Sequence, residues 1–240
     1  MPNNLVRPRP AEWQRGDLFP FIEECWSNSV AIVGNNNVVA ARLTAIDSIF
    51  FDVHHNLKPT NETQLVPSLL FLRSFSAFRA AVMVGLSLPT DSFALQRSCL
   101  EYAGYAKLVM LEPELARLWL LRDQNLAEVR KKFSNRAVRE AIEKDDAALA
   151  KIYQELYERS IDFGTHPNEK GVLGGVVPGS LDTGNMQVIL LAGDTPQLQH
   201  GVKSCAQVGI CALKIFNLIF RDHFAKSDFD AKIATASRPF

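Results

Sequence analysis

The chain has 240 residues, of which 47% are apolar and 22% are charged. These fractions are ordinary for a globular domain and exclude a disordered or fibrous chain. The 26 basic and 26 acidic residues cancel, so the overall charge does not indicate a nucleic-acid partner.

The first 34 residues are expected to form an N-terminal arm. They carry four large aromatic side chains, which predict an irregular segment or short helix packed on the main body: Trp13, Phe19, Phe21 and Trp26. Residues 1–10 contain three prolines, two arginines and no apolar block. We therefore expect no secretory leader.

The clearest helical pattern follows at 35–57. Residues 35–37 are all Asn, whose short amide can cap the first turn of a helix. Pro59 is expected to end this helix. Between them, apolar residues recur at intervals of three and four, the spacing of one helix face: Val39, Leu43, Ile46, Phe50, Val53 and Leu57.

Helices are also expected in the segments that follow, from periodicity and capping residues. Pro89 is the predicted break before the third helix, which Thr90 or Asp91 caps. Ser134 is a predicted cap within a charged helical stretch. The expected helical segments are about 62–87, 90–111, 113–121, 123–162 and 196–224.

A Gly-rich insertion is expected at about 164–194. Residues 164–184 hold six of the 13 glycines, a composition typical of a long loop. Met186–Leu191 could form a short strand, paired with 172–177 as a hairpin. Thr195 is then a predicted cap, followed by Pro196 at the first position of the long last helix.

The sequence therefore predicts an all-α fold, a bundle of about 6–8 helices. We expect one helical domain at 35–225, with the Gly-rich loop or short hairpin inserted before the long C-terminal helix, and a frayed tail at 226–240. Charged and amide residues interrupt the apolar run 202–220, so it reads as a buried or amphipathic helix and we expect no membrane span.

The cysteines and the candidate metal ligands indicate neither a disulfide nor a cofactor. The four cysteines form no Cys-x-x-Cys pair, so we expect buried thiols and a cytoplasmic location. Asp52 and His55 have the spacing of half a di-iron site, but no second copy exists. We therefore expect no metal.

A small set of charged residues lies in otherwise apolar helices. Arg73 and Arg79 are the only charges between 65 and 88. Arg97 and Glu101 fall away from the polar ridge of the next helix, which is formed by Gln96 and Lys107. We expect Glu101 inside the bundle among Arg97 and one or both of the other arginines, because a buried charge needs a partner. This cluster is either a structural ion network or a binding site for a small anionic ligand.

A second candidate lies at 157–167, where Arg159 and His166 have six residues between them. This spacing resembles the Arg…His motif of the HEPN family of helical bundles, several of which are metal-independent ribonucleases. The resemblance implies that the motif residues of two protomers meet at a dimer interface. A histidine is poised near neutral pH as a general acid or base, and an arginine stabilises a developing phosphorane charge. The alternative is a loop histidine that braces local backbone.

Residues 65–170 also resemble bacterial helical families whose activity is not settled. The resembling stretches are 97–105, Pro113 with 119–122, and 157–167. This resemblance implies the helical fold rather than a function.

A basic run at 130–139 has five cations and no acid: Arg130, Lys131, Lys132, Arg136 and Arg139. Such a run can contact a phosphate backbone. Acidic residues follow from Glu140, which favours a solvated helix face.

The apolar excess of the helices suggests a protein that acts by association, as a homodimer. The alternatives are a HEPN-like ribonuclease that uses Arg159 and His166, and a sensor of a small anion at the arginine cluster. We expect no cofactor.

Overall fold

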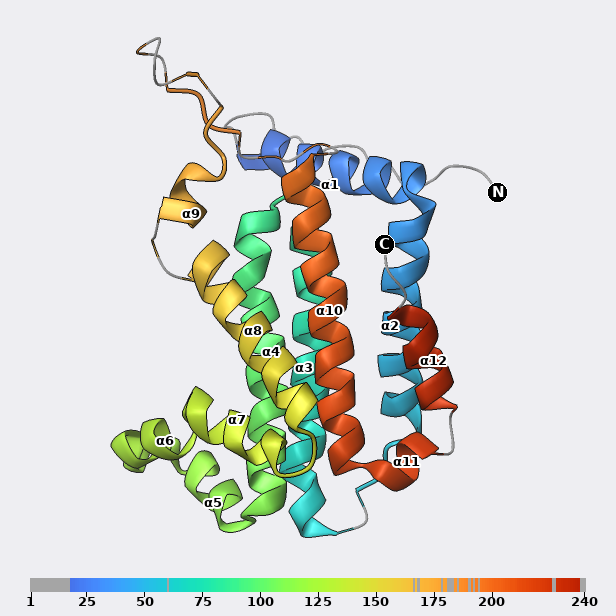
Figure 1. The fold of residues 1–240 in the computed structure, drawn as a ribbon, viewed down its shortest axis with the longest axis vertical. Coiled ribbons are helices and arrows are strands. Elements are labelled where there is room, and N and C mark those ends of the chain that lie inside the picture. Colours follow the sequence, from blue (N-terminus) through green and yellow to red (C-terminus); the bar gives the residue numbers. More distant parts are fainter. Residues whose placement is uncertain are drawn as a thin grey trace.

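The computed structural model describes residues 18–59, 61–165, 167, 169–177, 179–180, 184, 186–189, 191, 193, 195–225 and 228–237. The predicted all-α fold is confirmed (Figure 1). The helices are α1 (Leu18–Asn35), α2 (Asn37–Asn56), α3 (Leu65–Gly85), α4 (Pro89–Leu111), α5 (Glu114–Leu120), α6 (Leu126–Lys132), α7 (Asn135–Glu143), α8 (Ala147–Ser160), α9 (Glu169–Leu173), α10 (Pro196–Ile219), α11 (Arg221–Ala225) and α12 (Phe229–Ala236). A π-helical turn, η4 (Ile161–Thr165), extends α8, and η2 (Glu62–Gln64) and η3 (Arg122–Gln124) are short 3-10 turns.

The centre of the bundle is the antiparallel pair α3 and α4, against which α10 packs. Helix α8 covers α4 and α10 on one side, and α2 covers α3 and α10 on the other, with α12 packed on α2. Helix α1 crosses the upper end of the bundle, and the insertion projects beyond it (Figure 1).

Several helices begin where their capping residues predict. Asn36 accepts from the backbone N–H of Val39 at 3.1 Å, Ser134 caps α7, and Thr195 caps α10 ahead of Pro196. Helix α4 differs, because it begins at Pro89 itself and has no side-chain cap. A proline fits there because the first helical N–H has no intrahelical acceptor to lose.

The core combines aromatic stacking with small residues. The Phe50 ring lies 5.2 Å from that of Phe75 and 5.3 Å from that of Phe78. Gly209 of α10 lies directly against this group, since a Cβ there would come within 2.6 Å of the Phe78 ring and 2.9 Å of Ile46. The close approach of α10 to α2 and α3 therefore depends on this glycine.

The cysteines behave as small apolar residues. All four are free, and three are buried. Burial raises the pKa of the Cys99 and Cys205 thiols to about 12. They are therefore protonated and unreactive at neutral pH.

The polar ridge of α4, formed by Gln96 and Lys107, faces the interior, although the polar side of a helix usually faces the solvent. Gln96 is fully buried and donates to the Ser92 hydroxyl at 2.9 Å. Lys107 is only 4% exposed, and its ammonium donates to the Asp145 carboxylate in the turn between α7 and α8. A charged partner from outside the helix is what allows a lysine at a core position.

The insertion and the C-terminal segment also differ in part from expectation. No strand forms among the described residues of the insertion, where a single antiparallel bridge joins Val176 and Val188. The frayed tail is wrong for 229–236, which form α12 and bury Phe229 and Ile233 against the bundle. These apolar residues give the segment a reason to dock.

Helices α3 and α10 are long and apolar enough to cross a bilayer by length and composition alone. At least half of the most apolar stretch of each helix is buried inside the bundle. Core helices of soluble proteins meet the same criteria, so this observation by itself places neither helix in a membrane.

Candidate functional site

The charged residues predicted to form one cluster are divided between two sides of the bundle. Arg97 Nε donates to Glu101 Oε1 at 2.8 Å along α4. Arg79 instead points from α3 toward α2, where it forms two hydrogen bonds with the Asp47 carboxylate at 2.7 and 2.9 Å. Arg79 is therefore not a partner of Glu101, beside which the sequence predicts one or both of Arg73 and Arg79.

Arg73 is held by an aromatic ring. Its guanidinium lies 5.6 Å from the centre of the Tyr102 ring, and the side chain is exposed. Among the ion pairs that the structure describes, Glu101 pairs with Arg97 and not with Arg73. Sequence spacing placed these residues on neighbouring helices but could not reveal the direction of each long side chain.

Tyr157 of α8 completes the Arg97–Glu101 contact. The Tyr157 hydroxyl donates to Glu101 Oε1 at 3.3 Å, and the Arg97 guanidinium lies 5.0 Å from the Tyr157 ring centre. Burial, then the nearby Glu101 charge, raises the pKa of Tyr105 to about 12. Donors and acceptors here satisfy one another across α4 and α8, which is the arrangement of a structural network.

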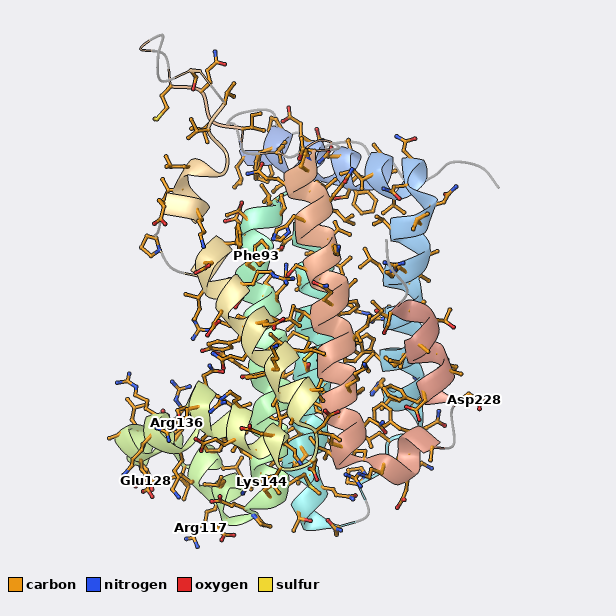
Figure 2. All side chains as sticks on the ribbon, viewed as in Figure 1. Phe93, Arg117, Glu128, Arg136, Lys144 and Asp228 are labelled. Carbon is orange, nitrogen blue, oxygen red and sulfur yellow. The ribbon has the colours of Figure 1, made fainter. Side chains whose placement is uncertain are left out.

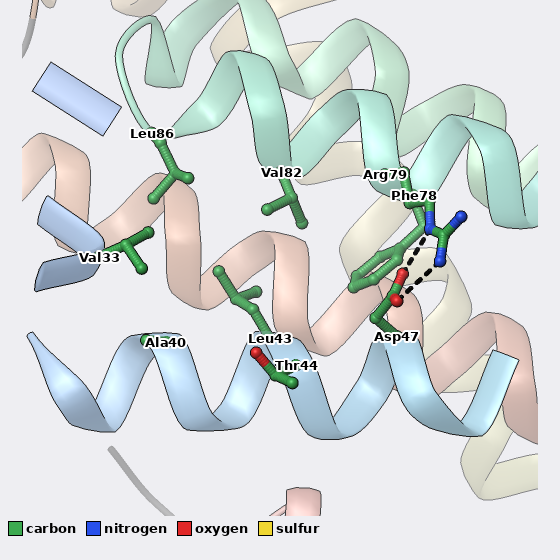
Figure 3. Close-up of a pocket in the computed structure, with 9 residues that line it drawn as sticks. All are labelled: Val33, Ala40, Leu43, Thr44, Asp47, Phe78, Arg79, Val82 and Leu86. Carbon is green, nitrogen blue, oxygen red and sulfur yellow. Dashed lines mark hydrogen bonds and ion pairs between the residues drawn. The ribbon is translucent and has the colours of Figure 1, made fainter. Parts of the chain in front are cut away.

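A pocket of about 230 Å³ opens between α1, α2 and α3, and the Arg79–Asp47 pair closes one end of it (Figure 3). The remaining wall is almost entirely apolar. Because Asp47 already neutralises Arg79, the pocket offers no free charge to an anion. Its lining residues are Val33, Ala40, Leu43, Thr44, Asp47, Phe78, Arg79, Val82 and Leu86.

Arg159, at the end of α8, forms a hydrogen bond with a neutral side chain of α10. Its Nη1 donates to the side-chain oxygen of Gln207 at 2.5 Å. His166, the other residue of the predicted motif, lies outside the described residues. The structure instead brings a different histidine, His200 of α10, within electrostatic range of Arg159.

Two aromatic rings hold His200 in place. The His200 ring centre lies 5.1 Å from that of Phe163 in η4 and 6.0 Å from that of Phe93 in α4. Phe93 lies in the upper part of the bundle (Figure 2). Partial burial, followed by the charges of Arg159 and Lys203, lowers the pKa of His200 below its usual 6.5.

The π-helical turn is what brings Phe163 to this position. Gly164 lies so close to α4 that an added Cβ would clash with the Thr90 carbonyl oxygen and approach Phe93 Cβ to 2.8 Å. A side chain at this position would push η4 away. Single π-helical turns of this kind occur often at functional sites.

Sequence reasoning missed His200, Lys203 and Gln207. Their spacing of three and four residues puts them on one side of α10, so a signal was present. Their meeting with Arg159 depends on how α8 crosses α10, and no local pattern carries that information.

The basic run lies at the opposite end of the bundle, in α6 and α7 (Figure 2). Three of its five cations face acidic side chains. The pairs are Arg136–Glu140 at 2.8 Å, Arg139–Glu143 at 3.7 Å and Lys132–Glu112 at 3.9 Å, with Arg130 and Lys131 exposed.

Asp52, one of the two residues with the spacing of half a di-iron site, forms an ion pair. Asp52 pairs with Lys232 of α12 at 2.8 Å and so ties the C-terminal helix to α2. No group of three or more metal-ligating side chains occurs in the part of the chain that the structure describes.

No family model, curated protein or solved structure matches the chain. Its function must therefore be argued from the geometry of its own residues.

Proposed function

We propose that the protein acts by association with a second copy of itself through the outer face of α3. The observation that supports this is an apolar row on that face. Leu65, Leu69, Leu72 and Met83 are 52%, 46%, 38% and 70% exposed. The outer face of α3 is defined as Leu65, Leu69, Leu72, Ser76, Arg79 and Met83, with the Arg79–Asp47 ion pair between the leucines and Met83.

Exposure of large apolar side chains to water costs free energy. Each Å² of apolar surface removed from water contributes about 25 cal/mol. Scattered exposed apolar residues are normal, whereas several exposed apolar residues on one helix face are typical of an interaction surface. A second copy of the chain would bury the row.

The order of side chains along the row favours an antiparallel arrangement of the two copies. The first half of the outer face carries leucines, and the second half carries Ser76, Arg79 and Met83. A two-fold axis near residue 74 would set Leu72 against Ser76 of the partner subunit and Leu65 against Met83 of the partner subunit. Each contact then occurs twice, as a two-fold interface requires.

The row alone covers less area than a stable interface. It is about 27 Å long at 1.5 Å per residue and roughly 10 Å wide, whereas a standard interface covers about 800 Å² on each partner. Neighbouring side chains must widen it, and the Arg73–Tyr102 contact lies on the α4 side of the row.

The test is the mass of the protein in solution, measured by light scattering and sedimentation at micromolar concentration. We expect a dimer. Leu69→Glu should give a folded monomer, because a carboxylate would be buried at the interface without a partner. Leu120→Glu is the control, since Leu120 is also exposed, at 63% against 46% for Leu69, but lies on α5. A monomeric wild-type protein, or equal effects of both variants, would refute the proposal.

A further inference from the structure

The pocket between α1, α2 and α3 is a space that short side chains of α2 leave open. Ala40 and Thr44 lie one turn apart on α2, and both line this pocket. Phe78 and Val82 of α3 form the facing wall (Figure 3). A longer side chain at either α2 position would fill the space between the two helices.

One end of the pocket is fixed by hydrogen bonds between α1 and the turn that joins α3 to α4. The Ser87 hydroxyl donates to the Cys25 carbonyl oxygen at 2.7 Å, and it lies 2.9 Å from the Ser29 hydroxyl. Val33 of α1 and Leu86, the residue before Ser87, both line this end (Figure 3). The width of the pocket is therefore set before any ligand arrives.

The opposite end of the pocket carries the Arg79–Asp47 ion pair (Figure 3). The pair uses Nε and Nη2 of the guanidinium and both carboxylate oxygens, at 2.7 and 2.9 Å. Each carboxylate oxygen has a second lone pair, and the guanidinium has three further N–H donors. The pair has no net charge, so it offers hydrogen bonds to a neutral group and no excess charge to an ion.

We propose that this pocket binds a small neutral molecule that has an apolar ring and one hydroxyl group, as phenol does. A hydroxyl can donate to Asp47 and accept from Arg79 at the same time. A carboxylate or phosphate would instead meet the negative charge of Asp47. Pockets for small molecules are commonly apolar with a few polar groups that orient the ligand.

The volume of the pocket favours a single ring over a larger ligand. The pocket holds about 230 Å³, whereas an apolar cavity of about 150 Å³ holds benzene. One ring with a small substituent therefore fits, with the ring against Val82 and Leu86 and the hydroxyl toward the ion pair. The site shares Arg79 with the outer face of α3, but all of its lining residues come from one chain, so it needs no second copy.

The experiment titrates the full-length protein separately with phenol, toluene and benzoate, followed by calorimetry and by NMR shifts of the Val33, Val82 and Leu86 methyl groups. Ala40→Leu fills the pocket. Ala148→Leu is the matched control, since it makes the same change at an exposed position of α8. Asp47→Ala removes the proposed acceptor of the phenol hydroxyl.

We expect the wild type and Ala148→Leu to bind phenol equally, with a Kd on the order of 1 mM. Ala40→Leu should weaken phenol binding about tenfold or more. Benzoate should bind the wild type about tenfold more weakly than phenol, because Asp47 already neutralises Arg79. Asp47→Ala should weaken phenol about fivefold and toluene much less, because toluene has no hydroxyl to lose a hydrogen bond.

Two further variants keep the result interpretable. If Ala40→Leu does not fold, Thr44→Leu replaces it, because Thr44 is exposed and lines the same pocket. Leu69→Glu should leave phenol affinity unchanged, since Leu69 does not line the pocket. A monomeric wild type that binds phenol would thus refute the dimer alone.

Three outcomes would overturn the proposal. The first is no saturable phenol binding by the folded wild type, or binding that the pocket-filling variant leaves intact. The second is benzoate binding tighter than phenol binding, which would identify an anion site. The third is an equal loss of phenol and toluene affinity in Asp47→Ala, which would show that the ion pair does not contact the hydroxyl.

Discussion

Lys107 of α4 and Asp145 of the α7–α8 turn form an ion pair whose two ends differ in burial. The lysine is almost completely buried, whereas the carboxylate reaches the surface and also lies 3.6 Å from Arg221. The pair thus joins the central helix to the turn before α8 and to α11.

This asymmetry predicts unequal effects of removing each partner. Asp145→Ala should lower the free energy of unfolding by about 2–3 kcal/mol, because it leaves a buried ammonium unpaired. Lys107→Met should cost less than about 1 kcal/mol, since it replaces the charge with an apolar chain of similar length and leaves a carboxylate that water can reach. Urea denaturation measures both values. An equal or reversed order would contradict the assigned burial.

The same pair predicts a pH dependence of stability. The hydrogen bond from Lys107, together with the charges of Lys107 and Arg221, holds the pKa of Asp145 below its usual 3.8. Because the folded-state pKa is depressed, the stabilisation is fully present above about pH 3.8 and is lost as the pH falls through the folded value. The stability difference between wild type and Asp145→Asn should therefore be constant from neutral pH to about pH 5 and shrink below pH 3.8. A difference that vanishes already near pH 6 would refute this assignment.

Helix starts could be predicted from sequence because capping is local. Asn36, Ser134 and Thr195 each accept a hydrogen bond from an N–H three residues ahead. Such contacts need no knowledge of the fold. The all-α class followed from the same short-range information.

The partners of charged side chains could not be predicted in this way. Lys107 looked like a surface residue because its partner, Asp145, is 38 residues away. Arg79 pairs with Asp47 on α2, at a separation of 32 residues. Both pairings depend on which faces the helices present to one another, and hydrophobic periodicity alone does not determine those faces.

Two glycines in helices should respond in opposite ways to alanine. Gly209→Ala should reduce stability by about 1–2 kcal/mol, because the new methyl overlaps Phe78 and Ile46 by more than the gain in helix propensity offsets. Gly34→Ala, in α1, meets nothing within 4 Å and should raise stability by up to about 1 kcal/mol. Thermal and urea denaturation test the pair. Stabilisation by both substitutions would show that α10 does not pack against α2 and α3 as described.

Two ion pairs of equal length on different helices differ in burial, so they should contribute differently to the stability of the fold. Arg97–Glu101 and Arg136–Glu140 are both 2.8 Å contacts with i, i+4 spacing. Glu101→Ala should cost about 1–2 kcal/mol, since it also removes the acceptor of the Tyr157 hydroxyl. Glu140→Ala should change stability much less, because solvent screens an exposed pair. Similar losses in the two variants would show that Glu101 is as solvated as Glu140.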